Sequence, residues 1–209
     1  MVDTLVRGGF MMIPILFGSV LALTIIIERL WVLQRSKVFP GAFLARMDEM
    51  VKSGRRSEAL SACRENDSTV ARILSEGLEN SNRPRNEIVE ALQVAGRRES
   101  AGMSRWVGAL GAIAALEPLM GLLGTVLGLI EAFKRVEATN IVGNPSAVAG
   151  GVWQALITTA AGLIIAIPAY AVYRYFRSRV SGLVMDMEQS AFQLVQELTA
   201  SGPTAEDLE

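Results

Sequence analysis

Three long apolar stretches constrain the fold of this chain more than any other feature of its sequence. They begin near Gly9, Trp106 and Ala147, and each is long enough to cross a bilayer, which takes about 20 mostly apolar residues. The chain is 51% hydrophobic, which is too apolar for an ordinary soluble domain, yet its charged segments are too long for a protein that lies entirely in lipid. We therefore predict an all-α, polytopic membrane protein with three transmembrane helices.

The first stretch is predicted to be retained as a membrane span rather than cleaved as a signal peptide. Its apolar run is longer than that of a signal peptide and contains no small-residue cleavage site. The sequence IERLWVLQR follows directly. Glu28 and Arg29 in this flank are predicted to anchor the span at the membrane surface, with Trp31 as an interfacial aromatic residue.

Lys and Arg residues are distributed unevenly along the chain. Most lie between the first and second stretches, several arginines follow the third, and the N-terminal residues hold only Arg7. Because positive charge favours the cytoplasmic side, we predict a periplasmic N-terminus and a cytoplasmic C-terminus. Lys134 and Arg135 are the pair that disagrees with this orientation.

The second and third spans are predicted to continue as long helices into a cytoplasmic helical region. The apolar pattern runs from Arg85 to Phe133 without a Gly-Pro stop, and Ser57 and Ser68 are predicted helix starts. Pro14 and Pro168 are predicted to kink or end helices. The predicted order is a periplasmic N-terminus (1–8), transmembrane helix (9–30), cytoplasmic helical region (31–105), transmembrane helix (106–134), periplasmic loop (135–146), transmembrane helix (147–174), cytoplasmic helix (175–200) and disordered tail (201–209).

The composition argues against several classes of function. The chain has no His and a single Cys63, which excludes Cys–His and Ser–His nucleophiles and the usual zinc sites. We expect no metal, no cofactor and no enzymatic activity. The basic middle segment lacks interleaved aromatic residues, so we expect contact with lipid headgroups and not with nucleic acid.

Small residues recur at helical spacing in the second and third stretches. Gly121, Gly124 and Gly128 form one stripe, so a neighbouring helix can approach closely there. The third stretch offers Gly162 and the hydroxyls of Thr158 and Thr159. These glycines are assigned to helix packing, together with Pro168. On the residues alone, the two threonine hydroxyls could instead bond the carbonyls of their own helix.

Three motifs extend this interpretation by resemblance. MIPILFGSVLALTIIIERL, PLMGLLGTVLGLIEAF and NPSAVAGGVWQALITTAAGLIIAIPAYAVYRYF are similar to the membrane segments of the MotA/TolQ/ExbB proton-channel family. Three spans point to its ExbB/TolQ branch in the bacterial inner membrane. The resemblance implies a homo-pentamer around an ExbD/TolR-type single-span partner. Proton flow would then energise an outer-membrane process such as TonB-dependent import or Tol–Pal function, through a TonB/TolA-type transducer.

The resemblance also implies roles for individual residues. Thr125 and Thr159 match the family's pore-facing threonines, and Pro168 matches the proline of its AIPA motif. Gln154 stands where the family usually carries glutamate. Glutamine cannot titrate, so the proton carrier would be an aspartate of the partner helix. A non-conducting scaffold of the same architecture is the alternative that Gln154 leaves open.

Glu117 is a carboxylate at membrane depth in the second stretch. Counting along the helices places it about 10 residues, on the order of 15 Å, deeper than Gln154. It could serve the cytoplasmic exit of the ion path, or it could pair with an arginine or a backbone group. The predicted ion path comprises Thr125, Thr159, Gln154, Glu117 and Thr158.

Overall fold

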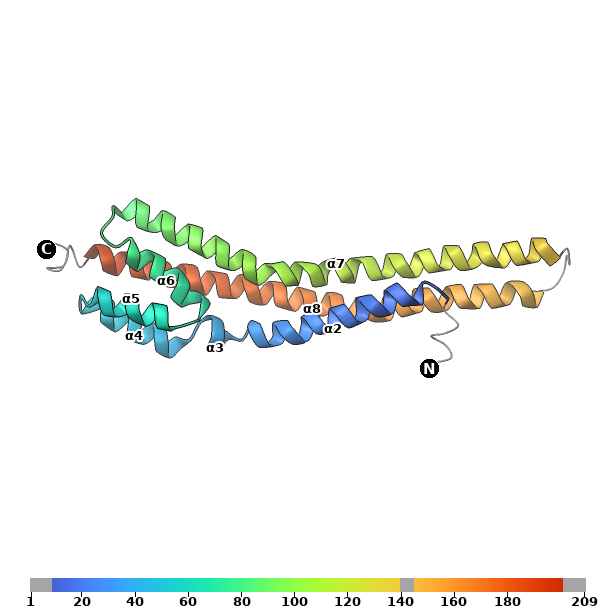
Figure 1. Ribbon diagram of the computed structural model, residues 1–209, viewed down its shortest axis with the longest axis horizontal. Coiled ribbons are helices and arrows are strands. Elements are labelled where there is room, and N and C mark those ends of the chain that lie inside the picture. The colour runs from blue at the N-terminus through green and yellow to red at the C-terminus, as the bar shows by residue number, and fades with distance from the viewer. Residues whose placement is uncertain (1–8, 140–144, 201–209) are drawn as a thin grey trace. The chain divides into compact units, whose positions relative to one another are not determined.

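The computed structural model describes residues 9–139 and 145–200, and every regular element in these ranges is a helix. The helices are α2 (Met12–Val32), α3 (Arg35–Val38), α4 (Gly41–Lys52), α5 (Arg56–Glu65), α6 (Thr69–Glu79), α7 (Arg85–Thr139) and α8 (Pro145–Ala200), as Figure 1 shows. The all-α prediction is confirmed, including the two long helices. The predicted N-terminal segment, the centre of the second loop and the tail lie outside the described residues.

The chain divides into two compact units. The first unit comprises Met1–Glu28 and Val107–Tyr175, and the second comprises Arg29–Trp106 and Phe176–Glu209. Helices α7 and α8 each contribute one part to each unit. The predicted membrane segments fall largely in the first unit, and the predicted cytoplasmic segments fall in the second.

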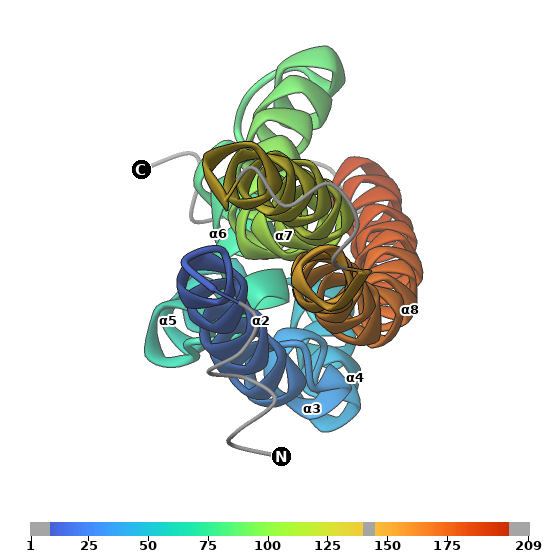
Figure 2. The same cartoon turned by 90° about the vertical axis from the view of Figure 1, so that its right-hand side faces the viewer.

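The first unit is built from α2 and the membrane-spanning parts of α7 and α8, which lie side by side in Figures 1 and 2. Each of these helices contains an 18-residue window with a mean hydropathy of at least 1.9. No more than 28% of any such window is buried within the chain. Exposed leucines, isoleucines and phenylalanines therefore cover the unit, and lipid or another protein must shield them from water.

Proline does not end either long helix. Pro118 lies inside α7 and Pro168 inside α8. The prediction that Pro168 could terminate its helix is therefore wrong, since the helix continues to Ala200. Proline is tolerated inside membrane helices because neighbouring groups satisfy the backbone carbonyl that it leaves without a donor. Pro14 lies in the first turn of α2, where proline is compatible with the helix.

The second unit has a conventional apolar core. Helix α6 lies against the first part of α7 and the last part of α8, and α5 packs between α6 and α4 (Figure 1). The largest fully buried side chains of this core are Val70, Ile73, Ile88, Phe176, Met187 and Val195.

One of the two predicted serine caps is confirmed. Ser68 precedes α6, and its hydroxyl accepts a hydrogen bond from the backbone N–H of Ala71 at 3.3 Å. Ser57 does not begin α5, because the helix already starts at Arg56. Gly54, with a φ of 74°, ends the preceding turn and brings the chain into the helix earlier than the serine predicted.

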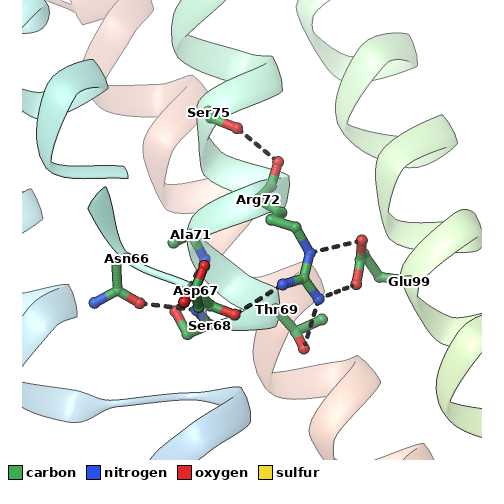
Figure 3. Close-up of polar contacts among 8 residues, drawn as sticks. All are labelled: Asn66, Asp67, Ser68, Thr69, Ala71, Arg72, Ser75 and Glu99. Atoms are coloured by element: carbon green, nitrogen blue, oxygen red, sulfur yellow. Dashed lines mark hydrogen bonds and ion pairs between the residues drawn. The ribbon is translucent and has the colours of Figure 1, made fainter. Parts of the chain in front are cut away.

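An ion pair connects α6 to α7 in the second unit, as Figure 3 shows. Arg72 donates to both carboxylate oxygens of Glu99, at 3.0 Å from Nε and 2.7 Å from Nη2. The same guanidinium donates to the carbonyl of Asp67 at 2.7 Å. This two-point geometry fixes the orientation of the guanidinium and holds the two helices in register.

Arg29 departs from its predicted role as a surface anchor. Its side chain is buried at 5% exposure, and Nη1 donates to the carbonyl of Met103 on α7 at 3.3 Å. The residue thus joins the end of α2 to α7 inside the second unit. Trp31 remains 67% exposed, as an interfacial aromatic residue requires.

Candidate functional site

The glycine stripe of α7 lies directly against α8 in the first unit. A methyl group added at Gly124 would lie 2.6 Å from the Thr158 hydroxyl oxygen, and one added at Gly128 would lie 3.0 Å from the Cβ of Ala155. In the other direction, a methyl group at Gly162 would lie 2.6 Å from the backbone oxygen of Glu117. Glycine is required at these positions because the two helices leave no room for a side chain between them.

The two threonines of α8 make different hydrogen bonds. Thr158 is buried, and its hydroxyl donates to the carbonyl of Ala155 in its own helix at 2.7 Å. Thr159 is half-buried and donates across the interface to the carbonyl of Gly121 on α7 at 3.0 Å. The own-helix alternative therefore holds for Thr158 and is wrong for Thr159.

Thr125 is half-buried and lies one helical turn beyond Gly121 on α7. Its hydroxyl donates to the carbonyl of Leu122 in its own helix at 2.6 Å. Thr125 and Thr159 thus occupy the same stretch of the α7–α8 pair. Each is partly exposed in the single chain.

Glu117 is enclosed by all three membrane helices. Its side chain is 1% exposed, and its Oε2 atom is buried without a hydrogen-bond partner among the described residues. A Cβ atom at Gly18 of α2 would collide with Glu117 Oε1, and the backbone of Glu117 faces Gly162 of α8. The described residues of the single chain provide no hydrogen-bond partner for Oε2, and pairing of this carboxyl with an arginine or a backbone group in an assembly stays a prediction.

Gln154 lies toward the other end of the same helix pair. It is half-buried, and its Nε2 atom abuts Gly9, the residue with a φ of 73° that precedes α2. The neighbouring Ala155 faces Gly128, which lies eleven residues from Glu117. This separation corresponds to about 16 Å along α7, so Gln154 and Glu117 belong to different levels of the helix pair.

The glycines that contact these two polar side chains were missed in the sequence. Gly18 is a single glycine within the apolar α2, and such a glycine usually has a packing reason. That signal could have marked Gly18 as a close approach, but it does not identify the partner. Gly9 carried no comparable signal. Pro168 is exposed in the single chain, and its predicted role in helix packing stays a prediction.

The described residues contain no group of three or more Cys, Asp or Glu side chains that could hold a metal ion. Within the apolar ranges 12–27, 107–130 and 149–169 of the membrane helices, the polar side chains are hydroxyls, the indole of Trp153, the amide of Gln154 and the carboxyl of Glu117. These groups can donate and accept hydrogen bonds, and the carboxyl can also bind a proton.

Comparison with known proteins identifies the family. Residues 65–189 match the MotA/TolQ/ExbB proton channel family, a range that includes all of the polar residues discussed above on α7 and α8. The chain belongs to this family. It is accordingly a multi-pass membrane protein from a family of channels.

Relatives place the chain near the ExbB proteins. It is 30% identical over 188 residues to a biopolymer transport protein ExbB homolog of Methanothermobacter thermautotrophicus, covering 90% of this chain and 63% of that protein. It is 34% identical over 184 residues to an ExbB-like protein of Synechocystis, covering 83% of this chain and 69% of that protein. The predicted ExbB branch of the family is confirmed.

A solved structure supports the same fold. The chain resembles a structure described as C. jejuni MotAB with a TM-score of 0.57, over 92% of this chain and 77% of that one. The two sequences are 22% identical, so this likeness concerns the fold alone.

Proposed function

We propose that the chain is an ExbB/TolQ-type subunit of a proton-motive-force-driven motor in the bacterial inner membrane. In this proposal it forms a homo-pentamer around an ExbD/TolR-type single-span partner and conducts protons with it. The work would energise an outer-membrane process such as TonB-dependent import or Tol–Pal function, through a TonB/TolA-type transducer. The N-terminus would be periplasmic and the C-terminus cytoplasmic.

The observation that carries the proposal is the hydrogen bond from Thr159 to the carbonyl of Gly121. It joins the two helices at the level of Thr125, so the two threonines matched to the family's pore-facing positions lie on one stretch of the α7–α8 pair. Both keep part of their surface exposed in the subunit, as groups that meet a partner helix or water must. The family match over this region supports the assignment of this face to an ion path.

Gln154 determines how the proton would be carried at its level of the pair. Its amide donates and accepts hydrogen bonds but does not take up a proton at physiological pH. It can therefore orient a water molecule or a partner's carboxyl, and the titrating group at this level would belong to the partner. The contact with Gly9 holds the amide near the start of α2.

Proton flux through proteoliposomes containing the chain and its partner tests the proposal. Under an imposed potential, a pH-sensitive dye should report faster flux than in empty liposomes. Thr159→Ala should reduce the flux, because it removes the hydroxyl that bridges α7 and α8. Thr24→Ala is the matched control, since Thr24 is exposed on α2 and donates only to the carbonyl of Val20 in its own helix.

The scaffold alternative rests on Gln154, which removes the usual carboxylate from its level of the helix pair. It predicts that the proteoliposomes pass protons no faster than empty liposomes, while the chain still co-purifies with its partner. In that case a glutamate-bearing relative, reconstituted in the same way, should still leak protons.

A further inference from the structure

Glu117 is the single ionisable side chain in the apolar core of the three membrane helices. The sequence contains no other Asp, Glu, Lys, Arg, Cys or Tyr within 12–27, 106–130 and 149–169. The carboxyl lies near the middle of the second of these ranges, far from the charged residues at either end. A titratable group at this depth is costly to insert and is by default a candidate functional site.

The surroundings of Glu117 offer its carboxyl no electrostatic partner among the described residues. Oε2 is buried without a hydrogen bond, and Oε1 lies against the Cα of Gly18. Within the apolar ranges, neither α2 nor α8 presents a charged or titratable group to it, and the Thr158 and Thr159 hydroxyls donate elsewhere. An ionised carboxylate here would be buried among apolar side chains without a cation from the described residues.

Binding a proton removes this difficulty. Moving an unpaired carboxylate into an apolar environment is far more costly than moving the neutral acid, so the group takes up a proton and enters the membrane uncharged. A metal cation would need several oxygen ligands, whereas the side chains around Gly18 and Glu117 supply one carboxyl. A proton needs only one oxygen atom.

We propose that Glu117 is a proton-binding site enclosed within each single subunit, with α2 at Gly18 as its cover. The site lies inside the three-helix unit and not on the half-exposed threonine face. Its proton exchanges when α2 separates from α7 at Gly18. The inference rests on the proposed function, because an enclosed proton site serves a subunit that moves protons.

Infrared spectroscopy of the full-length chain in liposomes tests the site directly and needs no partner protein. At neutral pH the native chain should show the carbonyl stretch of a protonated carboxylic acid, and Glu117→Gln should lose that band. Labelling the glutamate carboxyl carbon with a heavy isotope should shift the band in the native chain, which assigns the band to a protonated glutamate even if the variant fails to fold. Absence of the band would overturn the proposal. Its disappearance on adding Na⁺ at constant pH would also overturn it, in favour of a sodium site.

The role of α2 as the cover is tested by the rate at which the Glu117 proton exchanges for deuterium. In heavy water this exchange appears as a shift of the carbonyl band. Gly18→Ala places a methyl group where Oε1 lies, so it should shift the band and make the exchange several-fold faster. Gly108→Ala is the matched control on α7, since a methyl group there meets no side chain and no other helix within 4 Å. This variant should leave the position of the band and the exchange rate unchanged. Equal exchange in the two variants would overturn the role of α2.

Flux measurements with the partner separate this inference from the proposed function. A native complex that shows the band but passes no protons keeps the proton site and refutes the motor. A native complex that passes protons without showing the band keeps the motor and refutes the site. If both hold, Glu117→Gln should weaken the flux while the subunits still assemble.

Discussion

Gln154 and Glu117 are the amide and the carboxyl of the apolar membrane ranges, and Gln154 can only form hydrogen bonds whereas Glu117 can also titrate. They lie at different levels of the same helix pair. Gly128 marks the level of Gln154 on α7, and it lies about 16 Å from Glu117 along that helix. Although residue 154 is a glutamine, the apolar ranges of the membrane helices therefore still contain one carboxyl. That carboxyl is enclosed by its own subunit's helices.

Cys63 provides a prediction at the residue scale, outside the membrane. Its side chain is 2% exposed, and burial raises the pKa of the thiol to about 12. Alkylation requires the thiolate, so native Cys63 should react with iodoacetamide about a thousandfold more slowly than an ordinary thiol. Mass spectrometry of the adduct in the native chain and in denaturing detergent measures this ratio.

The control places an accessible thiol on the same helix. Ser61 is exposed, so the double variant Cys63→Ala, Ser61→Cys should be alkylated at similar rates in both states. Equal rates for native and denatured Cys63 would contradict its burial. Because the folded-state pKa of Cys63 lies above its ordinary value of 9.0, the thiol stabilises the fold below about pH 9. That contribution is lost as the pH rises toward 12.

At the scale of elements, the interface between α7 and α8 is formed by backbone and small side chains. Its stability therefore depends on the absence of side chains along the glycine stripe more than on buried apolar volume. Such an interface is sensitive to substitutions that would be harmless elsewhere on the same helix.

Gly124→Ala should destabilise this interface. The new Cβ would lie 2.6 Å from the hydroxyl oxygen and 2.8 Å from the Cβ of Thr158, and rotation of the threonine side chain relieves only the first contact. We expect a loss of about 1–3 kcal/mol relative to Gly108→Ala, which gains the same helix propensity without a collision. Thermal unfolding of both variants in lipid nanodiscs measures the difference. Equal stabilities would show that the helices adjust freely.

The sequence predicted the elements better than it predicted their contacts. The apolar pattern and the absence of stop signals predicted α7 from Arg85 to about Phe133, and the helix in fact continues to Thr139. Ser68 was a correct cap because its side chain acts locally. The contact between Gly18 and Glu117 could not be predicted, since it depends on the rotation of α2 about its axis. The sequence likewise did not predict which carbonyl Thr159 bonds, since that depends on how α8 is rotated against α7.

At the scale of the whole molecule, the charge distribution and the apolar exterior of the first unit have to fit one orientation in the membrane. The basic residues that follow α2 would lie in the cytoplasm, while Lys134 and Arg135 near the end of α7 oppose this arrangement. The positive-inside rule weighs the total of Lys and Arg near the spans, so the larger cytoplasmic group should prevail.

Single-cysteine variants in a Cys63→Ala background test the orientation. Ser57 and Glu137 are both exposed, the first on α5 and the second near the end of α7. In intact cells with a permeabilised outer membrane, a membrane-impermeant maleimide should label Glu137→Cys and not Ser57→Cys. Disruption of the inner membrane should make both reactive. The reverse pattern in intact cells would refute the predicted topology.

The close approach of α7 and α8 also limits how the first unit can change shape. Gly121, Gly124 and Gly128 on one helix and Gly162 on the other face backbone or Cβ atoms at near-contact distance. Sliding one helix along the other would break these fitted contacts and the hydrogen bond between Thr159 and Gly121. We therefore expect the paired parts of α7 and α8 to move together during proton transfer.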